Sequence, residues 1–205
     1  GKLIWQRAIH SGNLIKGGNK NASQASSTVV CDGTQLYVSF PNDKKIHTTA
    51  LSMEGKVLWQ RAVTDYVIHQ GFGTSPTVYR DVVIAKADSK KIGGAVAGLN
   101  KKTGKIIWKI SRPKYPNYTT PVMVTAHGKL QMVFAGAELI TSIDPLTGKK
   151  YWEFPGSTQE CVATAVTDGK RIFVSGGWPK NHIAAIEADG SGKITWQNTA
   201  RVYVP

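Results

Sequence analysis

A short signature, Gly-Lys-x-x-Trp, recurs five times along the 205-residue chain and constrains its fold more than any other feature. Successive signature tryptophans are 54, 49, 44 and 44 residues apart. Self-similarity at a period of roughly 20 to 50 residues is typical of repeat architectures, in which each repeat is one supersecondary unit. The signature tryptophans are Trp5, Trp59, Trp108, Trp152 and Trp196. We therefore expect an array of similar units, each about one signature interval long.

Each unit contains the pattern of four short strands, which we call A to D, with the signature tryptophan on D. Residues 27–39 and 163–175, for example, share an apolar segment, an Asp-Gly turn and a second alternating segment. The Gly-Lys pair forms the hairpin turn between strands C and D. No long stretch has an apolar period of 3.6 residues, so helices are expected to be absent or trivial. Four antiparallel strands in a unit of this length predict the blade of an all-β propeller.

The repeat count predicts one partial propeller over residues 1–205. D-type segments occur five times, whereas A, B and C segments occur four times. This count indicates four blades and one extra strand, cut from a longer array. The expected ranges are 1–9 for the last strand of a preceding blade, and 22–63, 73–111, 118–155 and 161–205 for the four blades.

The signature carries a family resemblance. Ser142-x-Asp144-x-x-Thr147-Gly148-x-x-x-Trp152 resembles the tryptophan-docking motif Ala-x-Asp-x-x-Thr-Gly-x-x-x-Trp of pyrroloquinoline-quinone-like (PQQ-like) repeat propellers. The turn before Trp59 is one residue shorter than this motif, and the turn before Trp196 is one residue longer. The resemblance covers the whole chain. It implies that the five signature tryptophans pack against neighbouring blades, and that four blades are about half of a seven- or eight-bladed ring.

Half a ring leaves three arrangements open. The chain pairs with a second copy to complete a ring, closes on itself as a four-bladed propeller, or is part of a longer chain that supplies the remaining blades. Each arrangement covers the apolar blade faces that an open half ring exposes.

Strand alternation assigns the connections to two faces of the disc. D-to-A and B-to-C connections share one face, which we call the loop face, and the tight A-to-B and C-to-D turns share the other, the turn face. Long irregular loops carry function more often than tight turns, so the candidate site lies on the loop face. Residues that precede A strands should rim the central channel, and Trp178 and His182 belong to a B-to-C connection. The candidate binding residues are Gln24, His69, Gln70, Tyr118, Gln159, Glu160, Trp178 and His182.

The favoured hypothesis is a non-catalytic scaffold whose loop face and channel mouth bind a protein partner or a small ligand. The resemblance to the cofactor-free outer-membrane assembly lipoprotein propellers implies this role. It also implies a periplasmic or extracellular location, although no signal sequence is visible in the chain. No catalytic residue is assigned, and no apolar stretch is long enough for a membrane span.

An enzymatic alternative is a fragment of a quinoprotein dehydrogenase that uses PQQ and calcium. The resemblance implies, for that class, a vicinal disulfide, a calcium cluster of carboxylate and amide groups, and an aspartate base. Cys31 and Cys161 lie 130 residues apart, and the loops show no such cluster. The five histidines also lack ligand spacing, so no metal site is predicted.

The net charge suggests a third hypothesis, a binder of anionic glycans or nucleic acid. Lysine and arginine number 26 against 13 acidic residues, which gives a formal charge of +13. Polyanion binding requires the basic residues to cluster on one surface. Strand topology instead places a similar positive excess on both faces, and five of the lysines belong to the repeated Gly-Lys turn. A nucleic-acid partner is therefore not expected.

Overall fold

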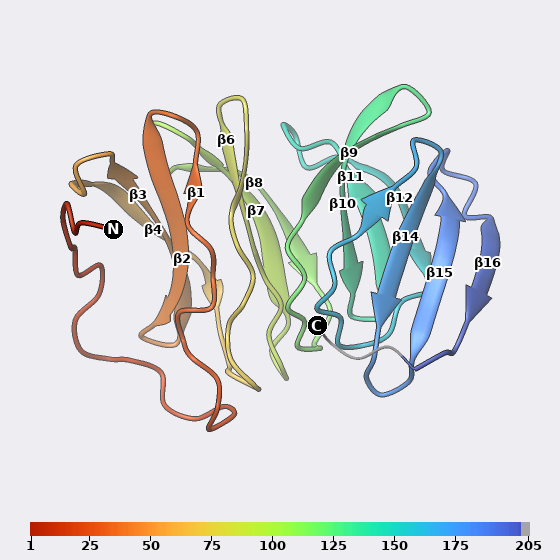
Figure 1. Cartoon of the computed structure of the whole chain (residues 1–205), viewed down its shortest axis with the longest axis horizontal. Coiled ribbons are helices and arrows are strands. Elements are labelled where there is room, and N and C mark those ends of the chain that lie inside the picture. The colour runs from red at the N-terminus through yellow and green to blue at the C-terminus, as the bar shows by residue number, and fades with distance from the viewer. Residues whose placement is uncertain (202–205) are drawn as a thin grey trace.

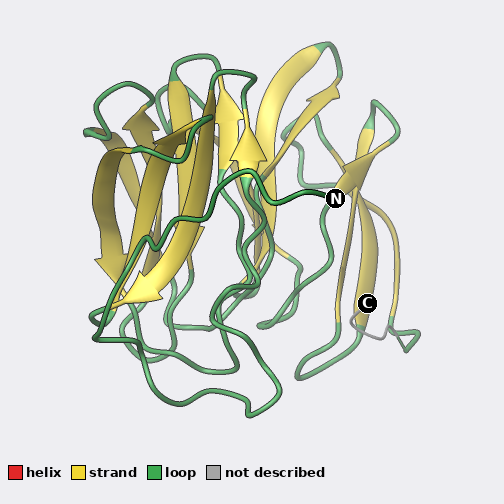
Figure 2. Cartoon of the chain, turned by 60° about the vertical axis from the view of Figure 1, so that its left-hand side comes forward, coloured by secondary structure: helices red, strands yellow, loops and turns green. Residues whose placement is uncertain are grey.

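The computed structural model describes residues 1–201, and within this range the chain has 16 strands and no helix. The strands form four antiparallel sheets of four, arranged side by side as an arc of blades (Figures 1 and 2). Each sheet is ordered as its strands occur in the sequence, from A to D. The predicted all-β propeller of four-stranded blades is therefore confirmed.

The strand bounds define the four blades. Blade 1 contains β1 (Val30–Cys31), β2 (Gln35–Asn42), β3 (Lys45–Ser52) and β4 (Val57–Asp65). Blade 2 contains β5 (Thr77–Tyr79), β6 (Val82–Ala87), β7 (Gly94–Asn100) and β8 (Ile106–Arg112). Blade 3 contains β9 (Val122–Ala126), β10 (Lys129–Gly136), β11 (Leu139–Ile143) and β12 (Lys150–Pro155). Blade 4 contains β13 (Val166–Thr167), β14 (Arg171–Gly176), β15 (His182–Glu187) and β16 (Ile194–Asn198).

The core lies between the blades. The middle strands of each inner sheet are covered on both faces, and every residue of β6 is buried. Such strands need near-continuous apolar runs rather than alternation, because neither face meets water. Tyr37, Trp59 and Leu99 belong to the apolar cluster between blades 1 and 2, and further clusters join blades 2 and 3 and blades 3 and 4.

Three signature tryptophans lie on the glycine of the next blade's Gly-Lys turn. A Cβ atom added at Gly104 would come within 2.6 Å of the Trp59 ring, and Gly55 and Gly148 are covered in the same way by Trp5 and Trp108. These glycines also have positive φ angles, which L side chains rarely adopt. The turn thus needs glycine for its backbone and for the ring that covers it. The Trp59 indole N–H also donates to the Lys101 carbonyl oxygen at 2.8 Å.

The last two signature tryptophans do not lie on the glycine of a Gly-Lys turn, although Trp152 packs in the apolar cluster between blades 3 and 4. Phe154 instead of Trp152 covers Gly192, with ring atoms within 2.6 Å of an added Cβ atom. Trp152 stacks on Phe154 at 5.3 Å between ring centroids and donates to Gln131 Oε1. The turn of blade 4 is one residue longer and has a second glycine, Gly190, at which an added Cβ atom would lie 3.6 Å from the Trp152 ring. Trp196 is 41% exposed, because no further blade covers it within the described residues.

Two stretches at the chain ends differ from the predicted strands. Residues 1–9, expected to form the last strand of a preceding blade, form no strand. A D strand needs a C strand beside it, and no such neighbour exists for this segment among residues 1–201. Trp5 nevertheless occupies the position of a D-strand tryptophan, since its indole N–H donates to the Met53 carbonyl oxygen. Residues 202–205, the end of the expected range of blade 4, lie outside the described residues.

The two faces differ in the length of their connections. The A-to-B and C-to-D turns are tight and lie at the top of Figure 1, whereas the long connections gather at the bottom. The bottom of Figure 1 is therefore the loop face. No helix within residues 1–201 has the length and apolar character that crossing a membrane requires.

Candidate functional site

Two adjacent cavities open on the loop face and bring together six of the eight predicted binding residues. The first cavity, of about 510 Å³, is mainly lined by small and apolar side chains around Phe72, Tyr118 and Val162. The second, of about 560 Å³, has Lys90 and Lys114 in its wall. Gln70, Glu160 and Trp178 line both cavities and separate them, and His69 and Gln159 line the second.

Three side chains form a polar cluster where the cavities meet. His69 Nδ1 lies 3.3 Å from the Tyr118 hydroxyl oxygen and 3.4 Å from Glu160 Oε1. The backbone N–H of Gln70 donates to the same hydroxyl oxygen at 3.4 Å. Burial raises the pKa of the Glu160 carboxyl, although His69 and Lys90 lower it in part. Burial and the nearby Glu160 also raise the pKa of the Tyr118 phenol, so Tyr118 stays a neutral hydrogen-bonding group.

Glu160 and Trp178 are held together through the backbone. The Glu160 N–H donates to the Trp178 carbonyl oxygen at 3.1 Å, and the Thr158 hydroxyl donates to the same oxygen. The Trp178 side chain remains 61% exposed at the edge of the partition. The Gln159 side chain is hydrogen-bonded to Glu138, because its Nε2 donates to Glu138 Oε1 at 3.0 Å. Trp178 is thus a fixed aromatic group that faces solvent.

The segment before blade 1 forms one wall of the apolar cavity. Asn19, Ala22 and Ser23 line the cavity together with Gly71 and Phe72. The Asn19 N–H donates to the Gln70 carbonyl oxygen at 2.8 Å, which ties this segment to the D-to-A connection of blades 1 and 2. Strand alternation placed D-to-A connections on the loop face, but the sequence did not show that this segment lies beside Gln70.

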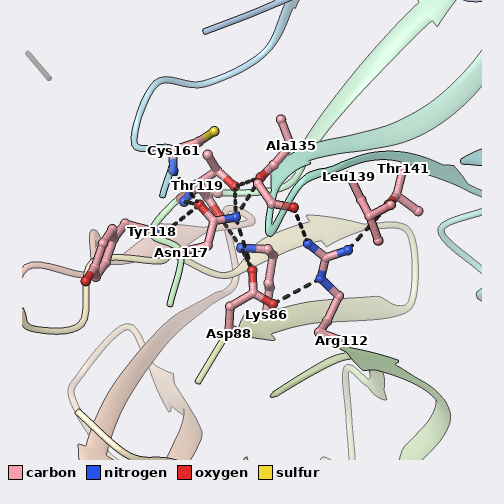
Figure 3. Close-up of polar contacts among 12 residues, drawn as sticks. Lys86, Asp88, Arg112, Asn117, Tyr118, Thr119, Ala135, Leu139, Thr141 and Cys161 are labelled. Carbon is pink, nitrogen blue, oxygen red and sulfur yellow. Dashed lines mark hydrogen bonds and ion pairs between the residues drawn. The ribbon is translucent and has the colours of Figure 1, made fainter. Parts of the chain in front are cut away.

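A buried polar network lies beneath the site and was missed by sequence analysis (Figure 3). Its centre is Asp88, which follows β6 and has no exposed side-chain surface. Asp88 Oδ2 lies 2.7 Å from Lys86 Nζ, and the Arg112 Nε–H donates to Asp88 Oδ1 at 3.0 Å. The flanking cations keep the pKa of Asp88 below its usual value, although burial acts in the opposite direction.

Asn117 extends this network to the candidate site. Its side-chain amide donates to Asp88 Oδ2 at 3.1 Å and to the Ala135 carbonyl oxygen at 2.7 Å. Its Oδ1 accepts from the backbone N–H groups of Tyr118 and Cys161 at 2.8 and 3.1 Å. Figure 3 shows Asn117 between the ion pair and these two segments. Because Tyr118 and Cys161 adjoin the cavity wall, the network fixes the backbone that presents Tyr118 and Glu160.

The network had one visible sequence signal. Lys86 lies in the apolar run Val82–Ala87 of a central blade strand, where an unpaired cation is costly, and Asp88 follows two residues later. A lysine in such a run predicts a buried partner. Arg112 ends β8 and Asn117 lies in the connection after it, and only the three-dimensional fold shows that they meet Asp88.

Gln24 and His182 lie apart from the candidate site. Gln24 borders a separate cavity with His10 and Phe40. His182 begins β15, and its Nε2 lies 3.4 Å from Gln197 Oε1. Neither residue lines the two cavities, so the candidate site contains the other six predicted residues. Gln24 faces the separate cavity although its neighbour Ser23 lines both that cavity and the apolar one, and His182 is the first residue of β15.

The donor groups present do not fit a calcium and quinone site. Glu160 is the carboxylate among the residues that line the apolar cavity, and it is paired with His69. Asp88 is enclosed by Lys86, Arg112 and Asn117, and Glu138 accepts from Gln159. Residues 1–201 contain no group of three histidine, cysteine or acidic side chains placed to hold a metal ion. Cys31 and Cys161 are both free thiols.

The fold and the docking turns define a propeller built from PQQ-like repeats. The sequence profile of a family described as outer membrane protein assembly factor BamB matches residues 1–203. The chain belongs to this family. No sequence among curated proteins shows significant similarity to the chain.

Solved structures share the fold at low sequence identity. BamB from Moraxella catarrhalis is 14% identical with a TM-score of 0.50, over 87% of this chain and 62% of its own length. Quinohemoprotein alcohol dehydrogenase from Comamonas testosteroni is 16% identical with a TM-score of 0.60, over 86% of this chain and 35% of its own. The corresponding values for quinohemoprotein alcohol dehydrogenase ADHIIG from Pseudomonas putida HK5 are 15%, 0.59, 92% and 35%. The chain therefore spans less than two thirds of these structures.

Proposed function

We propose that the chain is a non-catalytic binding platform that captures a protein partner with the two cavities of its loop face. The observation that carries the proposal is the convergence of Tyr118, Glu160 and Trp178 at the junction of two open cavities. Exposed tryptophan beside buried polar groups is a frequent composition of binding hot spots. The buried network beneath the cavities supports the proposal, because a preorganised surface loses less entropy on binding.

The family supports both the kind of partner and the location. The family description names an outer membrane protein assembly factor, and this name refers to other proteins and to the outer membrane. We extend this role to the chain as part of the proposal, together with a periplasmic or extracellular location. The dehydrogenases share the fold alone, and the donor groups at the site do not favour a quinone cofactor.

Capture of proteins from an extracytoplasmic extract by the immobilised chain tests the proposal. Trp178→Ala is expected to lower the amount of each specific partner by about tenfold, because truncating one hot-spot tryptophan commonly costs more than 1 kcal/mol. Trp196→Ala is the matched control, since Trp196 is also exposed but lies on the outer face of blade 4.

Thermal unfolding of both variants must match that of the parent chain. Under this condition, capture that survives Trp178→Ala unchanged, or that Trp196→Ala lowers equally, contradicts the loop-face assignment.

A further inference from the structure

The two cavities differ in chemical character although they share a partition. The apolar cavity contains Phe72 and Val162, together with the ring of Tyr118. The second cavity contains three lysines, Lys90, Lys91 and Lys114, against the one carboxylate of Glu160. Among residues 1–201, none of the three ammonium groups has an ion-pair partner within 4.0 Å. The second cavity is therefore a basic one whose charge is not compensated within the described fold.

We propose that the occupant is an extended peptide segment in which an aromatic side chain adjoins acidic side chains. This inference rests on the proposed function and names the chemical class of its partner. The aromatic side chain enters the cavity beside Phe72, and the acidic side chains meet Lys90 and Lys114. Trp178 covers the backbone of the peptide between them.

Charge and size favour this occupant over simpler ones. A purely apolar ligand leaves the three lysines without counter-charge, and a small anion leaves the apolar cavity filled by water. Neighbouring residues of an extended peptide are about 3.3 to 3.6 Å apart, so one segment reaches across a shared wall. Each cavity also lies within the range of about 300 to 1,000 Å³ typical of ligand sites.

The partition argues against a single-stranded nucleic acid. Such strands need a continuous basic groove and several aromatic stacking surfaces. Here Glu160 interrupts the basic surface, and Trp178 is the exposed aromatic ring at the partition. A peptide carries its charges on individual side chains, so these can be directed away from the Glu160 carboxylate. A phosphodiester backbone carries a charge on every nucleotide and cannot do this.

Four fluorescein-labelled, end-blocked peptides test the proposal by fluorescence anisotropy. Gly-Phe-Asp-Asp-Gly contains both features, Gly-Ala-Asp-Asp-Gly lacks the aromatic ring, Gly-Phe-Asn-Asn-Gly lacks the charge, and Gly-Phe-Lys-Lys-Gly reverses it. We expect the first peptide to bind at least about tenfold more tightly than the other three. Its affinity should also fall with added salt, because the contacts with exposed lysines are screened. Equal affinity for the acidic and basic aromatic peptides, or tighter binding of an oligothymidylate of equal charge, overturns the inference.

Charge variants give a second test with a matched control. The double variant Lys90→Glu, Lys114→Glu should lower the affinity for the Gly-Phe-Asp-Asp-Gly peptide by about tenfold or more. The double variant Lys149→Glu, Lys193→Glu changes the net charge equally on the turn face, and it should weaken binding less than about twofold. Equal losses in the two variants indicate long-range attraction alone and overturn the inference.

The sign of the Glu160→Gln effect separates this occupant from a cationic one. Removal of the carboxylate should raise the affinity for the acidic peptide about two- to fivefold, because the cavity then lacks a negative charge that repels the peptide. Weaker binding of that peptide overturns the inference. If Trp178-dependent capture of partners persists while no peptide discriminates, the binding platform stands and this ligand class is wrong. If capture is lost as well, both proposals fail.

Discussion

The junction between blades 1 and 2 and the junction between blades 2 and 3 come from the same repeat but are stabilised differently. Trp59 lies on Gly104 at the first junction, within an apolar cluster that contains Tyr37 and Leu99. The second junction has a comparable apolar cluster, and in addition the buried ions Lys86, Asp88 and Arg112.

The apolar and the ionic contacts have different roles at these junctions. Apolar contacts fix the spacing of blades, and they tolerate side-chain exchange when volume is kept. The ionic network contributes less net free energy, because desolvation of its charges offsets their attraction. The network nevertheless holds segments of three blades in place. Arg112 donates to the Gly136 carbonyl oxygen, and Asn117 Oδ1 accepts from the backbone N–H of Cys161. This network lies beneath the connections that present the candidate site.

The largest effect is expected for Asp88→Ala. This change leaves Lys86 and Arg112 buried without their anion, which should lower the free energy of unfolding by about 3 to 5 kcal/mol. Urea unfolding followed by circular dichroism measures the loss. Asp65→Ala removes an exposed aspartate and should stay within about 0.5 kcal/mol of the parent chain.

Replacement of the ions as a set sharpens this result. The triple variant Lys86→Met, Asp88→Val, Arg112→Met contains no uncompensated buried charge, so it should regain part of the lost stability. If Asp88→Ala itself lowers stability by less than about 1 kcal/mol, the interpretation of the network as a high-cost ionic junction is wrong.

Trp59→Ala tests the apolar junction and should have the next largest effect. Trp59 is 9% exposed and lies against the next blade, so its truncation should cost about 3 kcal/mol, the lower end of the usual range. Trp196 occupies the same repeat position and is 41% exposed, with no covering blade among residues 1–201, so Trp196→Ala should cost less than about 1 kcal/mol. Urea unfolding compares the two variants. Equal losses would show that the packing of the tryptophan within its own sheet, rather than on the next blade, stabilises the repeat.

The repeat made most of the fold predictable from sequence. The spacing of the signature tryptophans predicted four-stranded blades, and strand alternation placed the long connections on one face. The sequence could not show that residues 1–9 lack a neighbouring strand, because pairing depends on a partner outside the segment. The longer turn at residues 189–192 can be read from the sequence. That Phe154 rather than Trp152 lies on Gly192 depends on packing, which the sequence does not show.

The candidate site was predictable only in part. Their position before A strands predicted that Tyr118 and Glu160 lie on one face, and both line the apolar cavity. The same rule did not show that Gln24 borders a separate cavity while its neighbour Ser23 lines both that cavity and the apolar one. The network joins Lys86 of β6, Asp88 after it and Arg112 at the end of β8, and the pairing of β6 and β8 with β7 rather than a local pattern brings them together.

The smallest effect is expected for Asp32→Asn, which tests the polar contact of the apolar junction. Asp32 Oδ2 lies 3.0 Å from Lys101 Nζ of blade 2, with part of both side chains in solvent. Loss of this pair should cost about 0.5 to 1 kcal/mol at neutral pH, much less than Asp88→Ala, because solvent screens the charges. Asp168→Asn is the matched control, since Asp168 pairs with Arg171 of its own turn and joins no blades.

The pH dependence of the stability difference between the parent chain and Asp32→Asn tests whether Asp32 is ionised in the folded state. Burial alone would raise the pKa of Asp32, but hydrogen bonds from Thr34, Gln35 and Lys101 hold it below the usual 3.8. A lowered pKa in the folded state means that the contribution of Asp32 is fully present above the unfolded-state pKa and is lost as the pH falls below it. The stability difference between the parent chain and Asp32→Asn should therefore stay constant from pH 7 to about pH 5 and shrink below about pH 4. Urea unfolding at pH 7, 5, 4 and 3.5 measures it, and a difference that grows on acidification contradicts an ionised Asp32 between blades 1 and 2.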